Sequence, residues 1–110
     1  MKRNILITKN FREQAKEIFN FIQNDSPQNA NRFIDKLINE IKTIENNPEA
    51  NPPVTNFPNK SLRYRYKLFM KSFKIVYKVL KESLIFIGIL HKSQGNAAYN
   101  NLRKRIKSLD

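Results

Sequence analysis

Hydrophobic residues recur at helical spacing through the first half of the chain. From Phe11 to Ile22 they follow one another at intervals of three or four residues, with polar side chains between them, which predicts an amphipathic helix. A stronger stripe of the same period runs from Ala30 to Ile44. Ser26 and Pro27 stand between the two stripes, where serine can cap a helix and proline can occupy its first position. The short link predicts an antiparallel helical hairpin.

The period changes to two in the second half, after an irregular loop predicted for residues 46–60. From Leu62 to Leu68 apolar and basic residues alternate, which predicts a strand with one apolar and one cationic face. The run from Phe73 to Leu80 alternates in the same way, and the run from Leu84 to Leu90 is almost continuously apolar. The last run is therefore predicted to be buried on both faces at the centre of a three-stranded antiparallel sheet. Gly88 inside it predicts a bulge or a close backbone approach.

Two short segments complete the predicted fold. Ile5–Ile7 is aliphatic and predicts a brief N-terminal strand, and Ala97–Leu109 has the pattern of a basic amphipathic helix. The predicted class is α+β, with the N-terminal strand and the helical hairpin packed on a small antiparallel sheet. We expect one domain over residues 1–96 and a basic helical tail over 97–110. That tail is either docked on the domain or a mobile arm that binds an acidic partner.

Composition narrows the class of protein. The chain has 110 residues, no cysteine and one histidine, so we expect a single core without disulfides, metal ions or cofactors. The apolar stretch near the N-terminus is only three residues long, too short for a secretion signal or a membrane span. A cytoplasmic location without a membrane partner is expected.

The charge is concentrated in the second half of the chain. Residues 1–59 carry eight Lys and Arg against seven Asp and Glu, whereas residues 60–110 carry thirteen against two, within a net charge of +12. Such a field attracts acidic proteins or nucleic acid. Alternation predicts one cationic sheet face consisting of Arg63, Arg65, Lys67, Lys71, Lys74 and Lys78. The core face is predicted to consist of Leu62, Tyr64, Tyr66, Ile75, Tyr77 and Val79, with core packing of the tyrosines favoured over base stacking.

Several local patterns, in this order and at this spacing, resemble the RelE/ParE superfamily of small bacterial toxins from type II toxin-antitoxin operons and plasmid stabilisation systems. The resemblance covers about residues 3–92. It rests on the segments Ala15–Ile22, Ser26–Ala30, Asn47–Pro48, Leu62–Arg63, Phe73–Val79 and Ile85–His91. The long hairpin and the Ser26–Pro27 helix start are more similar to the ParE branch than to the RelE branch.

The resemblance implies a toxin that a cognate antitoxin neutralises through an acidic segment, in a toxin-antitoxin hetero-oligomer or with the toxin as a homodimer. ParE-like members inhibit DNA gyrase by protein binding and are not nucleases. RelE-like members are endoribonucleases that cut mRNA on the ribosome. A relative that binds antitoxin without being toxic is a third alternative.

The resemblance implies catalytic residues for a nuclease, whereas the distribution of charge suggests the binding residues of a toxin that acts on a protein. For a nuclease, the catalytic candidates are Arg65, Lys67, Lys74, His91 and Tyr99. Lys74 lacks the bidentate phosphate recognition of an arginine, and the basic residue expected after the last strand is Ser93 or Gln94. These departures favour a ParE-like toxin that acts by protein binding. Its target- or antitoxin-binding candidates are Arg63, Arg65, Lys67, Lys71, Lys74, Arg103, Lys104 and Arg105.

Overall fold

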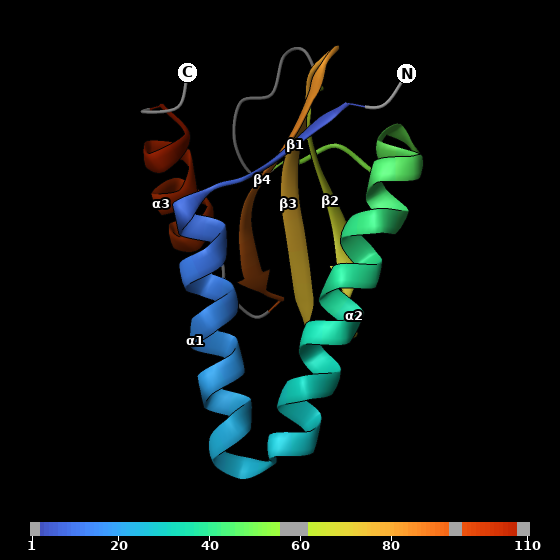
Figure 1. Cartoon of the computed structure of the whole chain (residues 1–110). Helices are drawn as coiled ribbons and strands as arrows, with labels where there is room; N and C mark the ends of the chain where they lie inside the picture. The colour runs from blue at the N-terminus through green and yellow to red at the C-terminus, as the bar shows by residue number, and fades with distance from the viewer. Residues whose placement is uncertain (1–2, 56–61, 93–95, 108–110) are drawn as a thin grey trace.

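The computed structural model describes residues 3–55, 62–92 and 96–107, in which a helical hairpin covers one face of a four-stranded sheet and a third helix covers the other (Figure 1). The elements in chain order are β1 (Asn4–Ile7), α1 (Lys9–Asp25), α2 (Pro27–Asn46), the 3₁₀ turn η1 (Pro48–Ala50), β2 (Tyr64–Phe69), β3 (Phe73–Val79), β4 (Ser83–His91) and α3 (Asn96–Lys107). The α+β class predicted from the sequence is confirmed.

Two hydroxyl side chains define where the hairpin helices begin. Thr8 Oγ1 accepts a hydrogen bond from the N–H of Phe11 at 3.1 Å and caps α1. Ser26 Oγ accepts from the N–H of Asn29 at 3.3 Å and caps α2. The Ser26 N–H also donates to the Ile22 carbonyl at 2.8 Å, so one residue ends α1 and begins α2. The predicted hairpin and its link are confirmed, and the helices diverge from that link in Figure 1.

The sheet has the strand order β1-β4-β3-β2. β2, β3 and β4 form the predicted antiparallel arrangement, and β4 occupies an interior position with most of its side chains buried, as its apolar run predicted. β1 pairs with β4 in parallel, with Asn4 opposite Ser83 and Ile7 opposite Phe86, so the sheet is mixed. The hairpin is the crossover that leads away from β1.

Gly88 lies at a bulge, as its position predicted. The β3–β4 register shifts between Val76 and Tyr77 of β3, so that Val76 lies opposite Gly88 and Tyr77 opposite Phe86. A Cβ on Gly88 would lie 2.8 Å from Gln14 Oε1 on α1 and 3.0 Å from a methyl carbon of Leu102 on α3. A larger residue at this position would force the ends of the Gln14 and Leu102 side chains to move, so glycine allows the two helices to approach the strand closely.

Side chains of α1 and of its N-cap residue complete the hydrogen bonding of β4 beyond the end of β1. Gln14 Oε1 accepts from the Ile89 N–H at 2.8 Å, and Asn10 Nδ2 donates to the Ile87 carbonyl at 2.9 Å. Thr8 Oγ1 donates to the Phe86 carbonyl at 2.9 Å. Three polar side chains thus take the place of a neighbouring strand and hold α1 in one register on the sheet.

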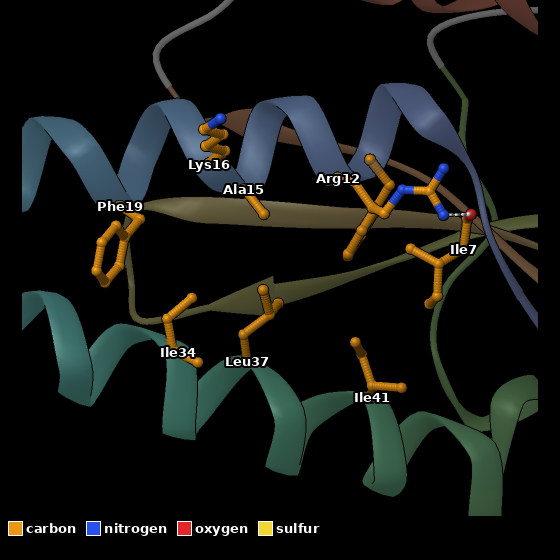
Figure 2. Close-up of a pocket in the computed structure, with 9 residues that line it drawn as sticks. Ile7, Arg12, Ala15, Lys16, Phe19, Ile34, Leu37 and Ile41 are labelled. Carbon is orange, nitrogen blue, oxygen red and sulfur yellow. Dashed lines mark hydrogen bonds between the residues drawn. The ribbon is translucent and has the colours of Figure 1, made fainter.

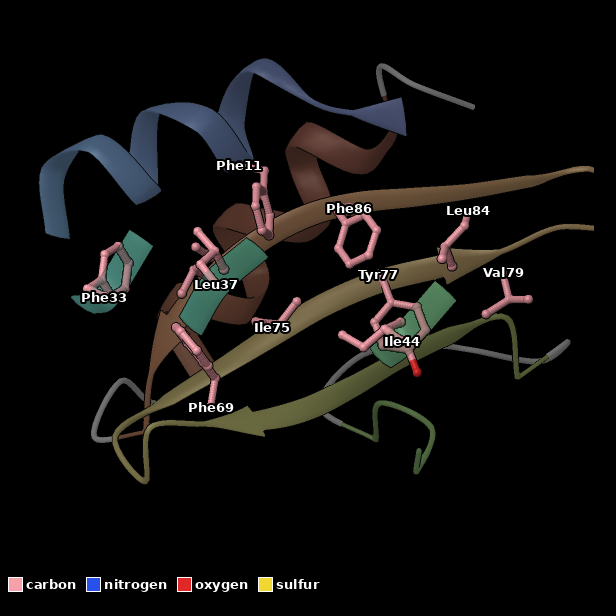
Figure 3. Packing of buried hydrophobic residues seen from close by; sticks show 11 residues of the cluster. Phe11, Phe33, Leu37, Ile44, Phe69, Ile75, Tyr77, Val79, Leu84 and Phe86 are labelled. Atoms are coloured by element: carbon pink, nitrogen blue, oxygen red, sulfur yellow. The ribbon is translucent and has the colours of Figure 1, made fainter. Parts of the chain in front are cut away.

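Two hydrophobic clusters lie on opposite faces of the sheet. The cluster beneath the hairpin consists of Phe11, Phe33, Leu37, Ile44, Phe69, Ile75, Tyr77, Val79, Leu84, Phe86 and Ile89 (Figure 3). The cluster beneath α3 consists of Val54, Val76, Ile87, Leu90, Tyr99 and Leu102. Tyr99 and Leu102 are 3% and 2% exposed, so these residues of α3 pack against the sheet. No helix within the described ranges is long and apolar enough to span a membrane.

The predicted core face of β2 is wrong at both ends. Leu62 is 51% exposed and has a φ of 54°, so it precedes the strand in a left-handed conformation instead of extending it. Leu68 is 59% exposed, and the buried residue at this end of β2 is Phe69.

Candidate functional site

The predicted single cationic face does not exist, because the pairing of β2 with β3 divides its residues between two faces. Residues directly opposite each other in an antiparallel pair share a face. Arg65 lies opposite Tyr77 and Lys67 opposite Ile75, beneath the hairpin. Lys74 lies opposite Leu68 and directly precedes Ile75 in β3. Because neighbouring residues of a strand point to opposite faces, Lys74 lies on the α3 face. The prediction that all these cations share one face is therefore wrong.

The tyrosines are divided in the same way. Tyr77 packs in the cluster beneath the hairpin, as predicted, whereas Tyr64 and Tyr66 pack on the α3 face. There the Lys74 ammonium lies 4.9 Å from the centre of the Tyr66 ring, and the Lys78 ammonium lies 5.1 Å from that of Tyr64. Each of these lysines thus makes a cation–π contact with a tyrosine ring of the neighbouring strand.

Arg65 and Lys67 hold the hairpin and the following turn against the sheet. Arg65 donates to the backbone carbonyl oxygens of Asn51 at 2.6 Å and Glu49 at 3.2 Å. Lys67 forms an ion pair with Glu40 of α2. Both cations therefore make structural contacts within the chain.

The buried Tyr77 hydroxyl bonds to the same segment after α2 that Arg65 contacts, and together these bonds form a polar network. It donates to the Pro48 carbonyl at 2.5 Å and accepts from Asn51 Nδ2 at 2.9 Å. Burial raises the pKa of Tyr77, against the opposing effects of the Asn51 hydrogen bond and the Arg65 charge. The network fastens the segment after α2 to the centre of the sheet.

The five predicted catalytic residues lie at three separate places. Arg65 and Lys67 are on the hairpin face, and Lys74 is on the α3 face, 5.9 Å from the centre of the buried Tyr99 ring. His91 ends β4, where its ring packs edge-on against Phe73 with centroids 5.5 Å apart. The structure brings Lys74 and Tyr99 together and separates them from the other three.

The remaining predicted binding residues lie outside these clusters. Arg63 is exposed before β2, Lys71 is exposed in the β2–β3 turn, and Lys104 is exposed on α3. The side chains of Arg103 and Arg105, and Ser93 and Gln94, lie outside the described residues. Within the described ranges, no three His, Asp or Glu side chains are grouped closely enough to hold a metal ion.

A concave site that was not predicted from the sequence lies between α1 and α2. It is a hollow of about 440 Å³ with an almost wholly apolar lining (Figure 2). Its lining consists of Ile7, Phe11, Arg12, Ala15, Lys16, Phe19, Ile34, Leu37 and Ile41, and we call this the hairpin groove. In Figure 2 the side chains of α2 face those of α1 across the groove, with strands behind them.

Two cations stand at the α1 edge of the hairpin groove. Arg12 and Lys16 are exposed and four residues apart, so they are neighbours on one side of the helix. Arg12 also donates to the Ile7 carbonyl at 3.3 Å, which holds its guanidinium at the groove. An apolar floor with a basic edge is suited to an amphipathic helix whose polar side is acidic.

Comparison with known proteins identifies relatives of this fold. Residues 5–95 match the family of the ParE toxin of the type II toxin-antitoxin system parDE. A chain of the chromosomal ParDE toxin-antitoxin system from P. aeruginosa is similar in structure, with a TM-score of 0.67 and 11% identity over 82% of this chain and 96% of that chain. A conserved hypothetical protein from Helicobacter pylori gives a TM-score of 0.44 and 17% identity over 86% and 98%. A sequence search of curated proteins found no match.

Proposed function

Because the chain belongs to the ParE toxin family of type II toxin-antitoxin systems, we propose that it inhibits DNA gyrase by protein binding in the bacterial cytoplasm. We also propose that a cognate antitoxin neutralises it by placing an amphipathic segment in the hairpin groove. The observation that carries the second proposal is the apolar groove with Arg12 and Lys16 at its edge.

The dimensions of the hairpin groove indicate the kind of segment that fits. Its α1 wall runs from Phe11 to Phe19, nine residues whose ends are about 12 Å apart along a helix. A partner helix of two to three turns would cover this length with its apolar stripe. Acidic residues spaced by four positions on that partner would meet Arg12 and Lys16, adding charge attraction to burial of the apolar lining.

The separation of the basic residues favours protein binding over RNA cleavage. A nuclease of this superfamily needs several cations around one phosphate, because stabilising its developing charge is the main catalytic effect. Here Arg65 and Lys67 contact other parts of the chain on the hairpin face, whereas Lys74 and Tyr99 lie on the α3 face. No one phosphate can contact both pairs through the sheet.

Two assays run in parallel test the gyrase proposal. The purified chain is added to DNA gyrase with relaxed plasmid and ATP, and separately to a cell-free translation reaction. We expect supercoiling to be inhibited while translation continues, and we expect prior addition of the antitoxin to prevent the inhibition. Unchanged supercoiling, together with mRNA cut during translation, would instead identify a ribosome-dependent nuclease.

A further inference from the structure

The tip of the helical hairpin, where α1 meets α2, presents an aromatic side chain to solvent. Phe21 is 80% exposed. It is two residues from Phe19, a rotation of about 200° around the helix, so it faces away from the hairpin groove. It follows Gln14 by two turns and therefore lies on the side of α1 that reaches β4. In Figure 1 the hairpin extends past the ends of the strands, so this side of α1 continues beyond the sheet at Phe21.

Two carboxylates flank Phe21 along the helix. Glu17 lies four residues before it and Asp25 four residues after it, so the three exposed side chains are neighbours in one row about 12 Å long. We call these three residues the tip row. Among the residues that the structure describes, neither carboxylate is in an ion pair. In a chain with a net charge of +12, the tip row is an acidic place with an aromatic ring at its centre.

Two hollows adjoin the tip row, and Phe21 lines both of them. One, of about 390 Å³, lies between α1 and the end of the sheet, and its lining includes Glu17, Ile18 and Phe73. The other, of about 460 Å³, has Asp25 in its lining. Each hollow thus combines apolar surface with one carboxylate of the tip row. A ligand that fills them needs a hydrophobic side chain with positive charge beside it.

We propose that the tip row and its two hollows bind the target protein of this toxin, through a segment with a hydrophobic side chain between two basic ones. The basic side chains, about 12 Å apart, would pair with Glu17 and Asp25, and the hydrophobic one would pack against Phe21. Charge selects this partner, because DNA phosphates and the acidic segment expected of an antitoxin would both meet like charge here. The inference rests on the proposed function, which takes DNA gyrase as the target.

Supercoiling assays with variants of the full chain test this site. Phe21→Ser should raise the toxin concentration that half-inhibits gyrase at least about tenfold, as truncation of a central aromatic anchor does. Ile38→Ser is the matched control, since Ile38 of α2 is 48% exposed and lines neither hollow. The control should change the half-inhibiting concentration by less than about twofold.

Charge reversal tests the chemistry of the partner. Glu17→Lys together with Asp25→Lys should weaken inhibition about tenfold, and more at low salt than at high salt, because two attractions become repulsions. Asp35→Lys together with Glu82→Lys gives the same net charge, and both residues are exposed and line neither hollow. Equal effects of the two pairs, or stronger inhibition after reversal of the tip row, would overturn the basic partner.

Growth arrest on expression gives a readout that does not assume gyrase. The wild type and Ile38→Ser should stop growth, whereas Phe21→Ser, checked for folding by its melting curve, should not. Arrest and gyrase inhibition that persist unchanged in Phe21→Ser would overturn the tip site and leave the proposed function standing. A wild type that arrests growth only with Phe21 in place, yet leaves supercoiling unchanged, would overturn gyrase as the target and keep the tip site. A wild type that does neither would overturn both.

Discussion

Replacing Gly88→Ala is expected to destabilise the protein by disturbing the contact between α1 and β4. The added Cβ would lie 2.8 Å from Gln14 Oε1, whereas ordinary contacts begin at 3.4 Å. The oxygen must therefore retreat by about 0.6 Å, which stretches its hydrogen bond to the Ile89 N–H from 2.8 Å to about 3.4 Å, beyond the usual range. A buried N–H without a partner costs about 1–3 kcal/mol.

The size of this effect can be measured by urea and thermal unfolding followed by circular dichroism. For a domain of this length, a loss of 1–3 kcal/mol corresponds to a fall in Tm of roughly 4–12 °C. The methyl carbon of Leu102, at 3.0 Å, is the far end of a flexible side chain and can move at lower cost. We therefore attribute most of the expected loss to Gln14.

A double-mutant cycle distinguishes this explanation from a general intolerance of alanine. Gln14→Ala alone should destabilise, because it leaves the Ile89 N–H without its acceptor. In that background Gly88→Ala should cost at least about 1 kcal/mol less than in the wild type, because the clashing oxygen is gone. Single effects that add to within about 0.5 kcal/mol would refute the reasoning.

Three further predictions concern the polar network, the hairpin groove and α3. Tyr77→Phe should lower stability by about 1–2 kcal/mol through loss of the bonds to Pro48 and Asn51. Since burial raises the Tyr77 pKa above 10.0, wild-type stability should fall as pH rises from 10.0 towards the folded pKa, more steeply than in the variant; parallel unfolding curves would contradict this. Reversing Arg12→Glu and Lys16→Glu together should weaken antitoxin binding by about 2 kcal/mol, roughly 30-fold in Kd by calorimetry, and less at high salt. The pair Arg32→Glu and Lys36→Glu, exposed on α2 at the same spacing and outside the groove, should change it little. Deleting residues 97–110 should lower the stability of the remaining domain by about 3–5 kcal/mol, because Tyr99 and Leu102 no longer cover Val76 and Leu90; unchanged melting would identify a separable tail.

The helical hairpin and the central strand could be predicted from local signals. Ser26 and Pro27 carry the chemistry of a helix start, and their role does not depend on distant parts of the chain. The apolar run of β4 likewise indicates burial on both faces, and one glycine within it indicates a bulge. In each case the residue types alone restrict the conformation.

The faces of β2 could not be assigned in this way. Alternation separates Arg65 and Lys67 from their neighbours, but it does not say which of the two rows faces the hairpin. That depends on the turn from Met70 to Ser72, which makes Phe69 and Phe73 partners. Met70 and Lys71 have φ values of 52° and 62°, a conformation usually signalled by glycine or asparagine, so the sequence does not mark this turn. The predicted cationic face was wrong for this reason.

The hairpin groove could not be predicted because it is a space between two helices rather than a pattern within one. The stripes of α1 and α2 predict that the helices pack together, but not how far they diverge. Arg12 and Lys16 appear in the sequence as ordinary solvated residues on the polar side of α1. Only the position of α2 shows that they stand at the edge of an apolar hollow.

The parallel pairing of β1 with β4 has a consequence for synthesis of the protein. Ser83, the partner of Asn4, is added to the growing chain 79 residues after it. At typical elongation rates this delay is about 4–16 s. The hairpin can form during that time from neighbouring residues, whereas β1 cannot pair until β4 has been synthesised. Closure of the sheet is therefore a late event, and a chain interrupted before β4 leaves β1 and the apolar side of the hairpin exposed to proteases.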